Sequence, residues 1–128
     1  DQGVHRYSIV TAGRDLSEIE LEKVCAIYKR MKAECSISLC ASHGLLSEDA
    51  FLALKESGVT MYHENIETSE RNFPNVCTTH TYEDKITGIR NAQKVGLRVC
   101  SGGIIGMGET FEDRLDMALS LAELGVDS

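Results

Sequence analysis

The sequence predicts an α/β fold with a parallel sheet, built from about four consecutive strand–helix units. Three predicted helix ends share one pattern, a glycine followed by an apolar residue that begins the next strand: Gly58-Val59, Gly96-Leu97 and Gly125-Val126. A glycine readily adopts the left-handed conformation that closes a helix, so each pair marks a passage from helix to strand. Units of about 30 to 38 residues follow from this spacing. Such alternation is typical of half a (β/α)8 barrel or of most of a doubly wound sheet.

The first two units are predicted from strand-like runs and helix caps. A strand at Tyr7–Ala12 leads to a helix that Ser17 and Glu20 open as a capping box. The alternating run Cys35–Ala41 predicts the second strand, and Ser47 caps the helix that follows it. Both helices carry apolar side chains at helical spacing, so each has one face to bury against a sheet.

The later units contain the longer loops. A third strand is expected over Val59–Thr68, followed by a polar loop, Ser69–His80, that holds the single proline of the chain. Thr81 opens the next helix as part of a capping box. The strand Leu97–Ile105 then runs into a glycine-rich turn. The final helix is expected over Phe111–Leu124, with Thr110 and Asp113 as the capping box that opens it.

Composition argues against several classes of protein. The chain has 20 acidic and 13 basic residues, a net charge of -7 that opposes binding to a phosphate backbone, so we expect no nucleic-acid partner. No apolar run approaches the roughly 18 residues of a membrane helix, so we expect no membrane association. Five cysteines without a C-x-x-C pair indicate free or metal-bound thiols in a reducing cytoplasm. The chain lacks an initiator methionine and stops where another strand should begin, which predicts that residues 1–128 are a partial domain, truncated at both ends.

Three polar side chains share one face of the expected third strand. His63, Asn65 and Glu67 alternate with Tyr62 and Ile66, which face the other way. Burying such groups unpaired costs about 1–3 kcal/mol each, so they either pair with one another and water or bind a polar ligand. An amide and a carboxylate two residues apart suit two adjacent hydroxyls, such as those of a ribose.

The glycine-rich stretch Val99–Glu109 is the second candidate site. Four glycines between a strand and a helix let bare backbone approach a ligand, although an ordinary strand-to-helix turn has the same pattern. Cys40 and Cys100 lie towards the carboxyl ends of their strands and are expected to face one cavity. Two such thiols can hold a soft metal or an iron–sulfur cluster, or can simply be buried. Cys77, in the polar loop, is assigned no role.

Two long motifs resemble the biotin synthases, a family of radical S-adenosylmethionine (SAM) enzymes. They are Tyr62–Ser69 and Val99–Thr110, with Thr78–Tyr82 between them, and the likeness extends over the whole chain from Tyr7. The resemblance implies a partial (β/α)8 TIM barrel, strands two to five with their helices, of an enzyme that is usually a homodimer. Such enzymes insert sulfur into dethiobiotin to form biotin and require sulfur and electron donors.

The resemblance also implies cofactors and the residues that hold them. SAM is cleaved on a [4Fe–4S] cluster to a 5′-deoxyadenosyl radical, and a second cluster, [2Fe–2S], gives up a sulfide. Cys40 and Cys100 match two cysteine ligands of the second cluster. Asn65 and Glu67 match positions that hold the SAM ribose, with Asn65 also near dethiobiotin, and Lys85 matches an arginine near the SAM carboxylate. The adenine side would be lined by Gly102, Gly103 and Ile105.

Some positions depart from the family pattern. Ser8 stands where another cysteine ligand of the second cluster is usual, Glu67 replaces an aspartate and His63 an asparagine. The loop that binds the [4Fe–4S] cluster is not in this chain, so the 128 residues alone are expected to be inactive. The alternatives are a sibling radical SAM enzyme of the hydrogenase-maturation or methylornithine-synthase type, a non-catalytic SAM-binding barrel segment, and a generic α/β domain with buried cysteines.

Overall fold

The computed structural model describes residues 3–128, and strands alternate with helices along this range. None of the helices in the described range is both long and apolar enough to cross a bilayer. The elements, in chain order, are β1 (Arg6–Val10), α1 (Glu18–Glu34), β2 (Ser38–Ser42), α2 (Glu48–Glu56), β3 (Val59–His63), α3 (Phe73–Val76), α4 (Tyr82–Lys94), β4 (Arg98–Cys100) and α5 (Phe111–Leu124).

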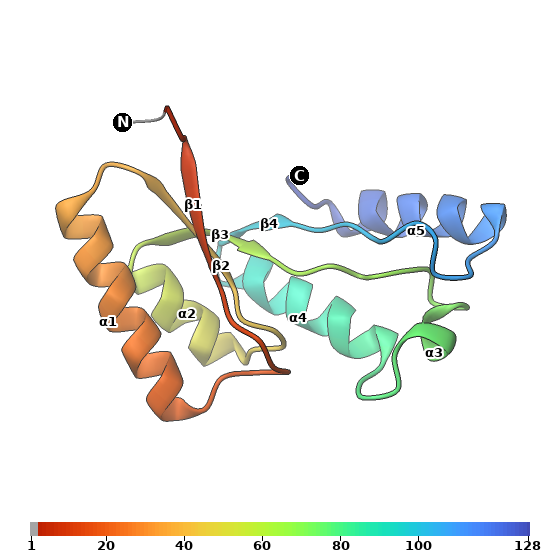
Figure 1. Ribbon diagram of the computed structural model, residues 1–128, viewed down its shortest axis with the longest axis horizontal. Helices are drawn as coiled ribbons and strands as arrows, with labels where there is room; N and C mark the ends of the chain where they lie inside the picture. The colour runs from red at the N-terminus through yellow and green to blue at the C-terminus, as the bar shows by residue number, and fades with distance from the viewer. Residues whose placement is uncertain (1–2) are drawn as a thin grey trace.

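The four strands form one parallel sheet in the order β1-β2-β3-β4, so each strand pairs with the next one along the chain. The helices α1, α2 and α4 follow one another along one side of this sheet (Figure 1). Sequential parallel strands with their helices on one side are typical of a (β/α)8 barrel, whereas a doubly wound sheet has helices on both faces. The prediction of a partial barrel is therefore confirmed, and the doubly wound alternative is wrong.

The core lies between the sheet and these helices. Leu39, Tyr62 and Val99, one from each of β2, β3 and β4, are at most 2% exposed and form one cluster with helix residues. Phe51 of α2 meets Tyr62 edge to face, with ring centroids 4.7 Å apart, a favoured geometry for aromatic pairs. Burial of one sheet face leaves the opposite face, which would line the barrel interior, for chemistry.

The predicted helix boundaries are confirmed by their caps. Ser17, Thr81 and Thr110 each form a complete capping box, in which the cap hydroxyl and the side chain three residues later satisfy each other's backbone N–H groups. The glycines that follow α2, α4 and α5 all have positive φ, of 108°, 80° and 62° at Gly58, Gly96 and Gly125. The closing glycine inferred from the sequence is therefore present at all three positions, and within the described residues a strand follows it after α2 and α4.

The strands are shorter than predicted. The third was expected over Val59–Thr68, but β3 ends at His63, and the fourth was expected over Leu97–Ile105, but β4 ends at Cys100. Beyond these ends the two segments still pair through separate hydrogen bonds and through an isolated bridge between Gly103 and Glu67, whose backbone is left-handed.

The second strand also begins later than expected. Cys35, expected to open the strand, instead caps the end of α1, because its N–H donates to Met31 O, and β2 begins at Ser38. The expected polar loop Ser69–His80 contains the short helix α3. Pro74 lies at its first turn, where a missing N–H is tolerated.

Candidate functional site

The chain segments that follow β3 and β4 run side by side and bring the two sequence motifs together. Glu64 N donates to Cys100 O at 3.1 Å, and Ile66 N donates to Gly102 O at 2.9 Å. In the other direction, Ile104 N donates to Glu67 O at 2.8 Å. This pairing continues the parallel sheet past its carboxyl edge, the end at which parallel α/β folds bind ligands.

The three polar residues predicted for one face of the third strand line one cleft. His63, Asn65 and Glu67 contribute to an open cleft of about 390 Å³ that also includes Glu64 and Lys85. Ile66 points the other way and is fully buried in the core. The cleft combines an amide, an imidazole, a carboxylate and an ammonium, so it offers both donors and acceptors to a polar ligand.

Lys85 is held at the cleft wall by two carboxylates. Its Nζ donates to Glu64 Oε1 and lies 3.7 Å from Glu67 Oε1. The side chains of Glu64 and Lys85 are only 4% and 10% exposed, whereas that of Glu67 is 26% exposed. The Glu67 carboxylate is therefore the acidic group of this triad that a ligand can reach.

Sequence reasoning missed Glu64 as the partner of Lys85. The available signal was positional, because Glu64 stands midway between Tyr62 and Ile66, whose side chains are both fully buried. Lys85 similarly precedes Ile89 by one turn on the buried face of α4. Two charges of opposite sign on buried faces are expected to pair, since either alone would be costly.

Glu67 adopts an unusual backbone conformation. Its φ of 67° makes it the one non-glycine residue with positive φ in residues 3–128. Thr68 N donates to Ile66 O at 2.9 Å, closing a tight turn around Glu67. A non-glycine residue in the left-handed region costs about 1–2 kcal/mol, so surrounding contacts must hold it there.

The glycine-rich turn meets the third-strand motif at Gly102 and Gly103. A Cβ at Gly102 would lie 3.7 Å from Asn65 Oδ1, an ordinary contact. A Cβ at Gly103 would lie 1.9 Å from Met117 Sδ and 2.9 Å from Glu67 O, so packing alone requires a glycine there. Ile105, expected on the adenine side of SAM, is 55% exposed in the same turn.

The later amides of the turn are already occupied. The Glu109 carboxylate accepts hydrogen bonds from Gly106 N at 2.8 Å and from Met107 N at 2.7 Å. The hydrogen bond from the Gly106 backbone is the largest cause that lowers the pKa of Glu109 to about 2. The expectation that bare backbone of this turn approaches a ligand is therefore wrong for these two amides, because the side chain of Glu109 already accepts their hydrogen bonds.

The two cysteines predicted to face the barrel interior lie on the same face of the sheet, Cys40 on β2 and Cys100 on β4, with β3 between them. Ser8 pairs in register with Cys40, and His63 pairs in register with Cys100, so each pair shares one side of the sheet. Arg6 Nη1 donates to Cys40 Sγ at 3.4 Å, and His63 Nδ1 lies 3.4 Å from Cys100 Sγ. No group of three or more His, Cys, Asp or Glu side chains within residues 3–128 is arranged to hold a metal ion.

Cys77 lies at a separate cavity of about 710 Å³ beside α3 and α4. Its Sγ is 3.5 Å from Thr79 Oγ1 and 3.4 Å from His80 Nδ1. Hydrogen bonding with Thr79 lowers the pKa of the Cys77 thiol, and burial lowers the pKa of His80. No role was assigned to this cysteine from the sequence.

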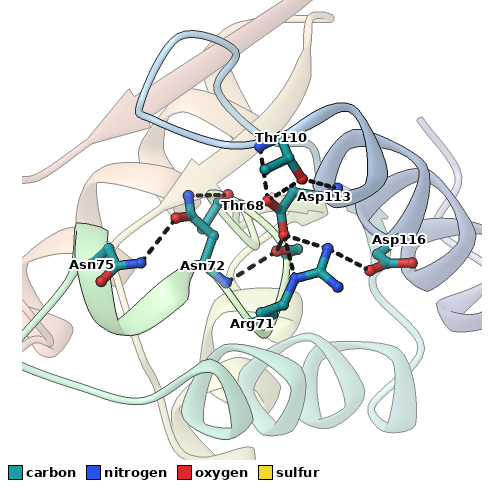
Figure 2. Close-up of polar contacts among 8 residues, drawn as sticks. Thr68, Arg71, Asn72, Asn75, Thr110, Asp113 and Asp116 are labelled. Carbon is teal, nitrogen blue, oxygen red and sulfur yellow. Dashed lines mark hydrogen bonds and ion pairs between the residues drawn. The ribbon is translucent and has the colours of Figure 1, made fainter.

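A second network missed by the sequence joins the loop after β3 to the start of α5 (Figure 2). Asp113 accepts hydrogen bonds from Ser69 Oγ at 2.5 Å and from Arg71 Nη2 at 2.9 Å. The same carboxylate completes the capping box with Thr110. The capping signature identified Asp113 from sequence, but its contacts with the distant loop depend on the tertiary fold.

Comparison with known proteins agrees with this arrangement. Over all 128 residues the chain is 74% identical to a biotin synthase of Alkaliphilus metalliredigens. It is 68% identical over 126 residues, 98% of the chain, to a biotin synthase of Clostridium beijerinckii. The chain spans about 40% of the length of each of these relatives.

Solved structures share the fold. A methylornithine synthase matches 98% of this chain and 38% of its own with a TM-score of 0.88 at 16% identity. A maturase of the [FeFe]-hydrogenase, HydG, matches 94% of this chain and 29% of its own with a TM-score of 0.72 at 20% identity. These likenesses concern the fold alone. The Radical SAM superfamily matches residues 1–121, and the chain therefore belongs to that superfamily.

Proposed function

We propose that this chain is the central part of a biotin synthase, an enzyme that inserts sulfur into dethiobiotin to form biotin. The observation that carries the proposal is the 74% identity over all 128 residues to the biotin synthase of Alkaliphilus metalliredigens. Residues 1–128 would form one partial barrel domain, since they cover 40% of that relative. The 128 residues alone would be inactive, because the [4Fe–4S]-binding loop lies elsewhere in the family pattern.

The cleft at the ends of β3 and β4 has groups that fit SAM. Asn65 offers an amide, and the reachable carboxylate of Glu67 can accept from two adjacent ribose hydroxyls. Lys85, fixed by Glu64, would direct its remaining N–H groups at the carboxylate of SAM. Gly102, Gly103 and Ile105 would line the adenine side, where the absence of a Cβ at Gly102 leaves room beside Asn65. When bound with its [4Fe–4S] cluster, SAM supplies the 5′-deoxyadenosyl radical.

The inner face of the sheet supports part of a second cluster site. Cys40 and Cys100 would provide two of the four ligands that a [2Fe–2S] cluster needs. Ser8, beside Cys40 in register, offers a hydroxyl where the family pattern has a thiol. We propose that this cluster is the immediate source of sulfur and that the other ligands come from strands outside these residues.

The substrate and partners follow from the same proposal. Dethiobiotin would lie on the inner face near Asn65, so one amide would border both SAM and substrate. The full-length protein would act as a homodimer in the cytoplasm with separate sulfur and electron donors. The net charge of -7 supports the absence of a nucleic-acid partner.

The first experiment measures iron, acid-labile sulfide and Mössbauer spectra of the anaerobically reconstituted full-length protein, together with biotin formation from dethiobiotin. Two distinct clusters and biotin as product are the expected result. A single [4Fe–4S] cluster without biotin formation would instead favour a sibling radical SAM enzyme, an alternative to which the Ser8 departure points. Absence of iron would favour a non-catalytic SAM-binding barrel.

Two variants test the residue assignments in the full-length enzyme. Glu67→Ala should weaken SAM binding in equilibrium dialysis, whereas Glu70→Ala, an exposed acid three residues later, should leave it unchanged. Cys100→Ala should deplete the second cluster and spare the first, with Cys35→Ala, an exposed cysteine, as the control. Equal SAM affinity in Glu67→Ala and the parent would contradict the ribose role. Equal iron and sulfide content in Cys100→Ala and the parent would contradict the ligand role.

A further inference from the structure

The buried carboxylate of Asp113 connects two elements that are far apart in the sequence. It accepts from Ser69 and Arg71, in the loop after β3, and from Thr110, at the start of α5 (Figure 2). Asp113 is only 4% exposed. The hydrogen bond from Ser69 is the largest cause that holds its pKa well below the usual range for an aspartate, so the carboxylate stays charged and accepts all of these bonds.

The loop side of this network begins next to Glu67. Thr68 and Ser69 are each 1% exposed, and both form hydrogen bonds with Asn72. The Asn72 side chain donates to Thr68 Oγ1, and the Asn72 backbone N–H donates to Ser69 Oγ. Ser69 therefore receives a bond from its own loop and gives one to Asp113. This fixes the backbone two residues beyond the left-handed Glu67.

Helix α5 is also connected to Glu67 through a second set of contacts, which involve Gly103. Met117, one turn after Asp113 on α5, packs against Gly103 so closely that a Cβ there would lie 1.9 Å from its Sδ. Gly103 in turn pairs with Glu67 as an isolated bridge. The first turns of α5 thus hold Glu67 from two directions, through Ser69 and through Gly103.

We propose that Asp113 is a positioning residue for SAM binding, which it supports through Ser69 by keeping Glu67 in its left-handed conformation. This inference rests on the proposed function, in which Glu67 binds the SAM ribose. A glutamate released from these contacts would relax to a more favourable backbone region, and its carboxylate would leave the cleft. SAM would then bind only the fraction of molecules in the competent conformation, and its apparent affinity would fall in proportion.

The test compares two single hydroxyl deletions in the full-length, reconstituted enzyme. Ser69→Ala and Thr110→Ala each remove one hydroxyl donor to Asp113, but only Ser69 belongs to the loop that carries Glu67. We expect Ser69→Ala to weaken SAM binding about tenfold in equilibrium dialysis, the effect of one lost bond of this kind. Thr110→Ala should lower the melting temperature and leave SAM affinity unchanged. The [4Fe–4S] content should equal that of the parent in both variants.

Two further variants separate positioning from general destabilisation. Ser69→Thr keeps the hydroxyl and should restore SAM affinity towards the parent value. Asp113→Asn should weaken SAM binding as Ser69→Ala does, and the double variant should be little worse than either, since both act on one contact. The inference is overturned if Ser69→Ala binds SAM as tightly as the parent does, or if Thr110→Ala lowers SAM affinity as much as Ser69→Ala does. Either result leaves the proposed function intact. A parent enzyme that loads its cluster but binds no SAM overturns both.

Discussion

Replacing Lys85 by methionine would leave the buried carboxylate of Glu64 without its cation. Removing one partner of a buried ion pair costs about 3–5 kcal/mol, because the remaining charge stays desolvated. Here Lys85 borders an open cleft and its side chain is 10% exposed, so water can enter beside Glu64. We therefore expect the lower end of the range, a loss of about 3 kcal/mol in the free energy of unfolding, measured by urea denaturation of the cluster-free full-length protein at pH 7.

Two matched variants make this prediction decisive. Lys94→Met removes an ion pair with Glu48 whose side chains are 68% and 45% exposed, so its cost should not exceed about 1 kcal/mol. In the double variant Lys85→Met with Glu64→Gln no charge remains buried at the pair, and stability should return to within about 1 kcal/mol of the parent. This prediction is refuted if Lys85→Met loses no more stability than Lys94→Met, or if the double variant is as unstable as Lys85→Met. Either result would mean that Glu64 and Lys85 do not depend on each other as a buried ion pair.

Three further outcomes are expected in the full-length protein. Gly103→Ala should destabilise the protein by about 1–3 kcal/mol in urea denaturation, because the added Cβ would lie 2.9 Å from the backbone oxygen of Glu67. Gly102→Ala should be near neutral, since its Cβ would make only an ordinary contact. Similar losses of stability for both variants would contradict the packing geometry. Glu109 has its pKa lowered from 4.5 to about 2 in the folded state, so its stabilising contribution is complete above pH 4.5 and is lost as pH falls towards 2. The urea midpoint of Glu109→Gln should accordingly depend less on pH over that window, and an unchanged pH profile would argue against the bonds to the turn. The lowered pKa of the Cys77 thiol predicts that iodoacetamide alkylates Cys77 rapidly at pH 7 and that Thr79→Val slows this alkylation. An alkylation rate that Thr79→Val leaves unaltered would rule out the Thr79 hydroxyl as the cause of the lowered pKa.

Local signals were sufficient for much of the fold and for one face of the site. The capping boxes at Ser17, Thr81 and Thr110 and the closing glycines depend only on residues a few positions apart, so the sequence predicts the helix ends closely. The period of two along the predicted third strand likewise grouped His63, Asn65 and Glu67, which line one cleft in the structure. These features are determined by short-range backbone geometry.

Strand ends depended on contacts between distant segments. The third strand was expected to continue to Thr68, yet β3 ends at His63, and at Glu67 the backbone turns into the left-handed region and pairs with Gly103. Neither a propensity nor a period predicts a left-handed glutamate, since isolated glutamate disfavours that conformation. Contacts with distant segments hold it in place, through Gly103 after β4 and through the hydrogen bond from Ser69 to Asp113 of α5.

What the sequence by itself determined was the alternation of strands and helices, the helix caps and the polar face at the end of the third strand. The tertiary structure alone decided which charges meet. Glu64 and Lys85 are 21 residues apart, and Ser69 and Asp113 are 44 apart. Their pairing requires the parallel sheet to place α4 and α5 beside the loop after β3. The physical reason is that caps and periods act within one or two turns of chain, whereas the burial of a charge depends on every element packed around it.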